Sequence, residues 1–159
     1  MLCIRVSIAR QTLELASGTK LLQSYSISTA LNGPGELKNS GCTPRGRHYI
    51  RAMIGSNAPE NSVFIGRRQT GEIYSEALAV AHPKRDWILT RIMWLSGLEI
   101  GQNRLGQVDT MQRYIYIHGT PDTEPMGVAK SHGCIRMRNG DLIELFSQVS
   151  AGTPVLIEE

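Results

Sequence analysis

The segment from Tyr114 to Arg136 holds the residue types that nucleophilic catalysis needs. His118 ends the alternating run Y-I-Y-I-H, and Cys134 follows it by sixteen residues within S-H-G-C-I-R. Cysteine acyl transfer requires a thiol nucleophile, a base that takes and returns its proton, and backbone N–H groups directed at the developing oxyanion. Cys134 and His118 are candidates for the first two roles, and the N–H groups of Gly133 and Cys134 for the third. Because a paired histidine lowers the pKa of a cysteine thiol, we expect Cys134 to be the most reactive thiol.

The residues alone leave a second interpretation open, in which Cys134 is a small buried core residue. Free cysteine is among the most often buried residue types. Cys3 lies in an expected strand and Cys42 in a glycine-rich loop, and neither has a comparable motif around it. Three cysteines do not indicate a disulfide framework, and the spacing of cysteines and histidines predicts no zinc site.

The combination of I-H-G-T (117–120) with S-H-G-C-I-R (131–136) resembles the active-site motif of the L,D-transpeptidase (YkuD-like) catalytic domain. The resemblance extends over most of the chain, through a strand at 11–15, the T-P-R-G loop at 43–46 and the G-T-P-V segment at 152–155. It implies a single catalytic domain over residues 1–159. The implied fold is mainly β and sandwich-like, with a mixed sheet and a C-terminal helix.

The resemblance also implies a role for each motif residue. Cys134 matches the nucleophile and His118 the general base and acid. The main-chain carbonyl of Gly119 matches the group that orients the imidazole, and Gly133 belongs to the turn that supports the thiolate and the oxyanion hole.

Three further motif positions are expected to bind substrate: Ser131, His132 and Arg136, the last by receiving a substrate carboxylate. The family acts on peptidoglycan stem peptides, attacking the carbonyl of the third residue and expelling the terminal D-Ala. The resemblance requires no cofactor or metal, and it implies acylation of the cysteine by carbapenems.

Four interpretations of function follow. We expect release of the acyl-enzyme by water, which is L,D-carboxypeptidase activity in murein recycling. The alternatives are an L,D-transpeptidase that forms 3→3 cross-links with an amine acceptor, a non-catalytic module that binds stem peptides, and a redox sensor with a resolving cysteine near Cys134.

Composition and charge limit the partners. The chain has 159 residues, of which 41% are hydrophobic and 19% charged, and a net charge of +3. This weak positive charge suits an anionic small substrate and does not indicate nucleic-acid binding. No apolar stretch approaches the roughly 18 residues that a membrane helix needs, and no secretory leader is recognisable. We therefore expect a cytoplasmic location, or a periplasmic one if a leader precedes this sequence.

Hydrophobic periodicity predicts the elements that position the motif. Alternation predicts strands at 2–8, 12–16, 20–28, 48–54, 63–65, 114–118 and 155–157, joined by loops at 32–46 and 119–132. Apolar spacing predicts a helix at 142–149, capped by Asn139 or Asp141. The segments 76–81 and 88–98 fit either helix or strand, so the substrate lid within 56–107 has no predicted structure.

Several polar and aromatic residues receive a structural interpretation. We expect His48 and His82 at the surface or in turns, Arg67 and Arg68 on a solvated face, and Trp87 and Trp94 in the core.

Overall fold

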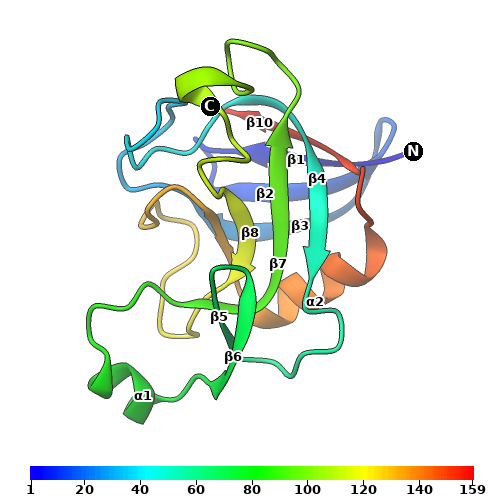
Figure 1. The fold of residues 1–159 in the computed structure, drawn as a ribbon. Helices are drawn as coiled ribbons and strands as arrows, with labels where there is room; N and C mark the ends of the chain where they lie inside the picture. Colours follow the sequence, from blue (N-terminus) through cyan, green and yellow to red (C-terminus); the bar gives the residue numbers. More distant parts are fainter.

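The computed structural model describes all 159 residues and is built mainly from strands (Figure 1). It contains two α-helices, α1 (Glu76–Ala81) and α2 (Asn139–Gln148), and a short 3-10 helix at Gly106–Val108. The ten strands are β1 (Leu2–Ser7), β2 (Thr12–Ser17), β3 (Lys20–Ser28), β4 (Gly46–Ile54), β5 (Ser62–Ile65), β6 (Arg68–Ile73), β7 (Ile88–Gly97), β8 (Tyr116–Gly119), β9 (Ile135–Met137) and β10 (Pro154–Glu158).

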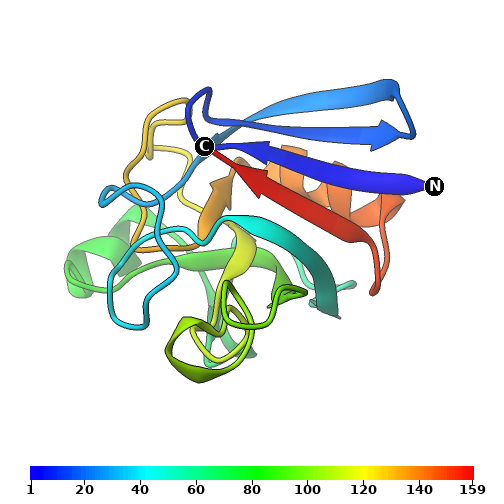
Figure 2. The same cartoon turned by 90° about the horizontal axis from the view of Figure 1, so that it is seen from above.

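Hydrogen bonds join all the strands into one sheet that closes on itself. The strand order is β4-β10-β1-β2-β3-β9-β8-β7-β5-β6, and β4 also pairs with β7. The β1–β10 and β8–β9 pairs are parallel and the others antiparallel, which confirms the predicted mixed sheet. Figure 2 shows β10 and β1–β3 forming one layer and β4, β7 and β8 the other.

The hydrophobic core lies between these layers because each strand turns alternate side chains inward. Ile4 and Val6 of β1 and Leu13 and Leu15 of β2 are almost completely buried. Together with residues of β7, β8, β9 and β10 they form a cluster of 18 buried residues. Helix α2 contributes Leu142 and Leu145 to that cluster and packs against β7 and β8 at one end of the layers (Figure 1).

Helix α2 differs from the sequence prediction at its start. Helix α2 begins at Asn139, three residues earlier than expected, and neither Asn139 nor Asp141 caps it. Arg138 occupies the N-cap position without a side-chain hydrogen bond, and the Asn139 side chain bonds the Thr120 carbonyl instead of the helix backbone. The 76–81 segment, which fitted either helix or strand, is helix α1. Ser75 caps it by accepting a hydrogen bond from the Leu78 N–H at 3.1 Å. Neither helix has the length and apolar character needed to cross a membrane.

Three strands were incompletely described by periodicity: β6, β7 and the three-residue strand β9, which was not predicted. The ambiguous 88–98 segment is strand β7, and its burial on both faces explains the near-continuous apolar sequence. Strand β6 was not predicted because its residues are mostly exposed and polar. It pairs with β5 through a turn in which Gly66 and Arg67 have φ of 57° and 67°, the backbone of a tight hairpin. This hairpin and α1 extend away from the closed sheet (Figure 1).

The prediction for His48 was wrong. Its side chain is fully buried inside β4, where Nδ1 lies 3.0 Å from the Gly46 carbonyl and Nε2 lies 2.9 Å from Thr110 Oγ1. Burial lowers the pKa of His48 to about 4. Both ring nitrogens are satisfied, which is why this polar residue is tolerated on the buried face of β4. His82, in contrast, is exposed at the end of α1, as expected.

Candidate active site

The parallel pair β8–β9 brings the two halves of the motif together. Ile117 lies opposite Ile135 and His118 opposite Arg136. Because paired residues in neighbouring strands point to the same face, Ile117 and Ile135 enter the core while His118 and Arg136 face the other way. Cys134 immediately precedes β9 and therefore faces the same side as His118.

His118 is held as a neutral base. Its side chain is 1% exposed, and Nδ1 lies 2.6 Å from the Gly119 carbonyl oxygen. A carbonyl oxygen only accepts hydrogen bonds, so Nδ1 carries the proton and Nε2 keeps its lone pair. Burial lowers the pKa of His118, which keeps the ring uncharged at neutral pH. The contact that the sequence assigned to the Gly119 carbonyl is therefore present.

The Cys134 thiol differs from the sequence expectation. Sγ accepts a hydrogen bond from the Tyr116 N–H at 3.3 Å and donates one to the Tyr114 carbonyl at 3.4 Å, and none joins it to His118. The half-buried side chain packs against a small apolar cluster that includes Phe64 and Tyr116. This burial raises the pKa of Cys134 to about 12. The resting site thus holds a protonated thiol, where the sequence predicted an activated thiolate.

The turn before Cys134 is fixed by hydroxyl groups. Ser131 Oγ donates to the Cys134 carbonyl at 2.5 Å and accepts from the Gly133 N–H at 3.2 Å. Thr43, from the T-P-R-G loop, donates to the Gly133 carbonyl at 2.8 Å. The predicted oxyanion donor Gly133 is therefore already occupied, whereas the Cys134 N–H makes no hydrogen bond within the protein. Gly133 has φ of 132°, a conformation that a side chain disfavours.

Arg136 lies in an ion-pair network beside this turn. Its side chain is 9% exposed, and Nη2 lies 3.2 Å from an oxygen of Asp86, while Nη1 lies 3.7 Å from Glu124. The second oxygen of Asp86 lies 3.4 Å from Nδ1 of His132, whose side chain is 74% exposed. The buried Nε of Arg136 has no partner. Asp86 was not predicted as part of the site, since nothing in the sequence around it indicates this contact.

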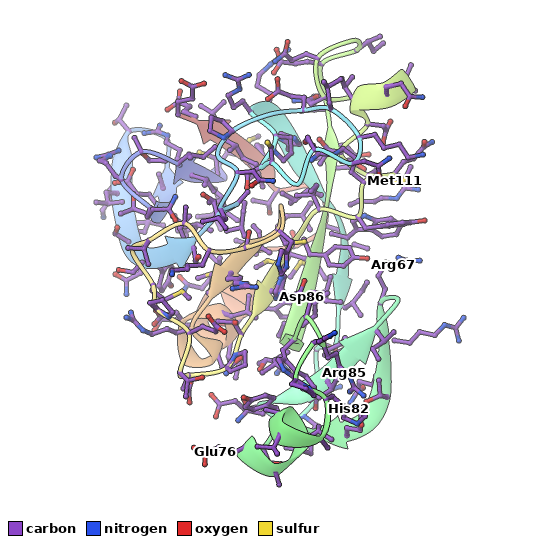
Figure 3. All side chains as sticks on the ribbon, turned by 90° about the vertical axis from the view of Figure 1, so that its left-hand side faces the viewer. Arg67, Glu76, His82, Arg85, Asp86 and Met111 are labelled. Carbon is purple, nitrogen blue, oxygen red and sulfur yellow. The ribbon has the colours of Figure 1, made fainter.

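An aromatic cluster on the same side receives Arg67, which the sequence analysis placed on a solvated face. The guanidinium carbon lies 4.8 Å from the ring centre of Trp94 and 4.7 Å from that of Tyr114. Arg67 also donates to Tyr116 Oη at 3.0 Å. Figure 3 shows Arg67 at the tip of the β5–β6 hairpin, on the side of the molecule that also carries Asp86. Trp94 is only half-buried, and it contacts both Arg67 and the small apolar cluster around Phe64.

Arg113 organises the loop at 32–46. It donates to the Cys42 carbonyl at 2.7 Å, to the Gly35 carbonyl at 3.3 Å and to the Glu36 carbonyl at 3.2 Å. Burial lowers the pKa of this arginine. No sequence motif singled it out, because its partners are backbone atoms far away in the chain.

Two clefts meet at His132. One, of about 240 Å³, is lined by residues that include Lys38, Arg113 and Tyr114. The other, of about 200 Å³, is lined by residues that include Asp86 and Arg136. No three His, Cys, Asp or Glu side chains are close enough together to hold a metal ion.

The fold and site define a closed, mainly β domain that presents a cysteine and a neutral histidine on the same face of the sheet. The family model described as the L,D-transpeptidase catalytic domain (YkuD) matches residues 3–157. The chain therefore belongs to this family of enzymes.

Relatives support the same assignment. The chain is 56% identical to YkuD of Bacillus subtilis over 41 residues, which are 26% of this chain and 25% of that protein. It is 46% identical to YqjB of the same organism over 43 residues, 27% of this chain and 24% of that protein. These alignments span about a quarter of the length of the relatives.

Solved structures share the fold. An L,D-transpeptidase from Mycobacterium smegmatis matches with a TM-score of 0.58 and 16% identity, covering 99% of this chain and 58% of the other. L,D-transpeptidase 3 from Mycobacterium tuberculosis, in complex with a faropenem-derived adduct, matches with a TM-score of 0.58 and 17% identity, covering 99% and 60%. The predicted fold class is confirmed.

Proposed function

We propose that this chain is a cysteine acyl-transfer enzyme that cleaves the L,D bond before the terminal D-Ala of peptidoglycan tetrapeptide stems. The observation that carries the proposal is the hydrogen bond from His118 Nδ1 to the Gly119 carbonyl. It leaves Nε2 as a base on the sheet face that also presents Cys134. Membership of the L,D-transpeptidase family supports the substrate class.

The proposed acylation starts from a protonated thiol. The Cys134 side chain leaves its contact with Tyr114, turns toward His118, and loses its proton to Nε2 as Sγ attacks the carbonyl of the third stem residue. The Cys134 N–H, which has no partner within the protein, donates to the developing oxyanion. Collapse breaks the C–N bond, and the departing amine of D-Ala takes the proton from His118.

We propose that water completes the cycle. Water attacks the thioester, His118 accepts its proton, and the tripeptide leaves as a carboxylate while the thiol is restored. The exposed His132 side chain, which lines two open clefts beside the motif, leaves an approach for solvent. Water at roughly 55 M outcompetes a dilute amine unless the site excludes it.

The second candidate reaction is 3→3 cross-linking, and the two clefts are the observation that favours it. His132 lines both clefts, of about 240 and 200 Å³, and we assign one to a donor and the other to an acceptor peptide. In that case an amine replaces water as the second nucleophile, and the same two residues perform the proton transfers.

Substrate binding is proposed to use the charges beside the motif. Arg136 would exchange its ion pair with Asp86 for a substrate carboxylate, because its buried Nε has no partner and a carboxylate can accept from two guanidinium nitrogens at once. His132 and Ser131 would line and support that position. We also propose a cytoplasmic location, because a reducing compartment suits a chain whose three cysteines are free thiols.

Mass spectrometry of products tests these proposals. A defined tetrapeptide is incubated with the enzyme, with and without an amine acceptor. We expect tripeptide and D-Ala in both reactions. Dimers as the main product would establish cross-linking instead, and tight binding of tetrapeptide without any product would establish a non-catalytic module.

A further inference from the structure

The side chain of Asn139 joins three separate segments around the carbonyl that holds His118. It is 1% exposed and belongs to the first turn of α2. We infer that Asn139 is a positioning residue for the catalytic base, acting through the Gly119–Thr120 backbone together with Thr90. The part of this inference that concerns turnover rests on the proposed function, whereas the part that concerns the histidine ring does not.

The carboxamide of Asn139 uses both its polar atoms. Nδ2 donates to the Thr120 carbonyl and to Asn61 Oδ1, each at 3.0 Å. Oδ1 accepts from Thr90 Oγ1 at 2.6 Å. Asn139 therefore connects the end of β8, the turn before β5 and the start of β7. A residue needed only to begin a helix would instead bond the backbone of its own first turn.

The carboxamide also packs directly against Gly119. A Cβ atom placed on Gly119 would overlap Asn139 Oδ1 and would lie 2.6 Å from the Leu89 carbonyl oxygen. The glycine is therefore required by close packing. With its Cα against Oδ1 and the next carbonyl bonded to Nδ2, the peptide that carries the Gly119 carbonyl is fixed at both ends. That carbonyl is the acceptor for His118 Nδ1.

Thr90 adds a second observation. It is completely buried with φ of 76°, an unfavourable conformation for a β-branched residue. It lies where the pairing of β7 with β8 is irregular, between Leu89 and Ile92. The strained backbone places Oγ1 to donate to Asn139 and to accept from the Asn61 N–H at 3.0 Å. Strain of this kind persists where the surrounding structure holds a residue for a function.

The consequence for chemistry is control of the histidine tautomer. A shifted Gly119 carbonyl would no longer select the Nδ1-protonated ring, and a fraction of molecules would carry the proton on Nε2. Those molecules have no base facing the thiol side of the site. Loss of the orienting group for a catalytic histidine acts in this way in the serine protease triad.

The test measures the ring directly. Nitrogen NMR of the full chain with labelled histidine distinguishes the two neutral tautomers of His118. We expect a single Nδ1-protonated form in the unmodified protein and a mixture in Asn139→Ala. In the tetrapeptide assay Asn139→Ala should lower kcat by about 10- to 100-fold, with KM changed by less than about twofold.

Two comparisons separate positioning from stability. Asn103 is also completely buried, and its carboxamide bonds the Arg45 and Arg47 carbonyls and the Glu99 N–H, at the other end of β7. Asn103→Ala should lower stability but leave the His118 tautomer and kcat unchanged. Thr90→Val keeps the shape of the side chain and removes the hydroxyl, whereas Thr90→Ser keeps the hydroxyl. We expect the mixture of tautomers in Thr90→Val and the single form in Thr90→Ser.

A single His118 tautomer in both Asn139→Ala and Thr90→Val would overturn the inference. The inference would also fail if Asn103→Ala changed the His118 tautomer and kcat as much as Asn139→Ala does. If the unmodified protein shows no turnover, the proposed function fails, and the tautomer measurement still decides the role of Asn139.

Discussion

Replacing Arg67 by methionine should release the β5–β6 hairpin from the aromatic cluster beside Cys134. Arg67 is half-buried, stacks on Trp94 and Tyr114, and donates a hydrogen bond to Tyr116 Oη. Each stacking contact contributes about 0.5–1 kcal/mol at a partly exposed site, and the charged hydrogen bond about 1.5 kcal/mol, the lower end of its range. The sum is a local stabilisation of about 2.5–3.5 kcal/mol.

Native-state hydrogen exchange measures this quantity. Loss of about 2.5–3.5 kcal/mol should make the amides paired between β5 and β6 exchange about 70- to 370-fold faster, without a matching change in the core strands. Arg68→Met is the matched control, because Arg68 is the exposed neighbour and makes no side-chain contact of this kind. Equal exchange rates in the two variants would refute the assignment of Arg67 as the residue that holds the hairpin.

Three other predictions concern pH and backbone strain. Because burial lowers the pKa of His48 to about 4, the unfolded chain binds a proton before the folded one does as the pH falls. Between pH 7 and 5 the free energy of unfolding should therefore fall by about 2 kcal/mol more in the unmodified protein than in His48→Gln. Urea denaturation measures this difference, and the control variant His82→Gln, at an exposed histidine, should behave like the unmodified protein. Since burial raises the pKa of Cys134, its alkylation by iodoacetamide should keep accelerating above pH 8.5, and a plateau reached at neutral pH would contradict the protonated resting thiol. Gly133→Ala should destabilise the protein by about 1–3 kcal/mol because of its φ of 132°, whereas Gly140→Ala, in α2 with open space around it, should raise the melting temperature.

The sequence predicts best what depends on neighbouring residues. Alternation identifies β1, β2 and β10 because one face of each is buried in the core. The short motif around Cys134 predicts the family because its glycine and serine are required by the local turn. The Gly119 contact of His118 was implied by the family resemblance, and it is a local contact because the acceptor is the next residue.

Contacts between distant segments escape such reasoning. Arg67 and Asp86 reach the site only through the fold, and Thr43 bonds Gly133 across 90 residues of sequence. Asn139 is a residue type that often caps helices, yet its side chain makes tertiary hydrogen bonds and does not cap α2. The raised pKa of the thiol depends on how closely apolar residues pack around it, which a motif does not encode.

Mass spectrometry of the intact protein, mixed with tetrapeptide and quenched during turnover, tests the central claim most directly. The account predicts a tripeptide acyl group attached to Cys134, located by digestion of the trapped protein, and no adduct or D-Ala release in Cys134→Ala. An acyl group on Cys42, or undiminished D-Ala release in Cys134→Ala, would contradict the assignment of Cys134 and His118 as the reacting pair.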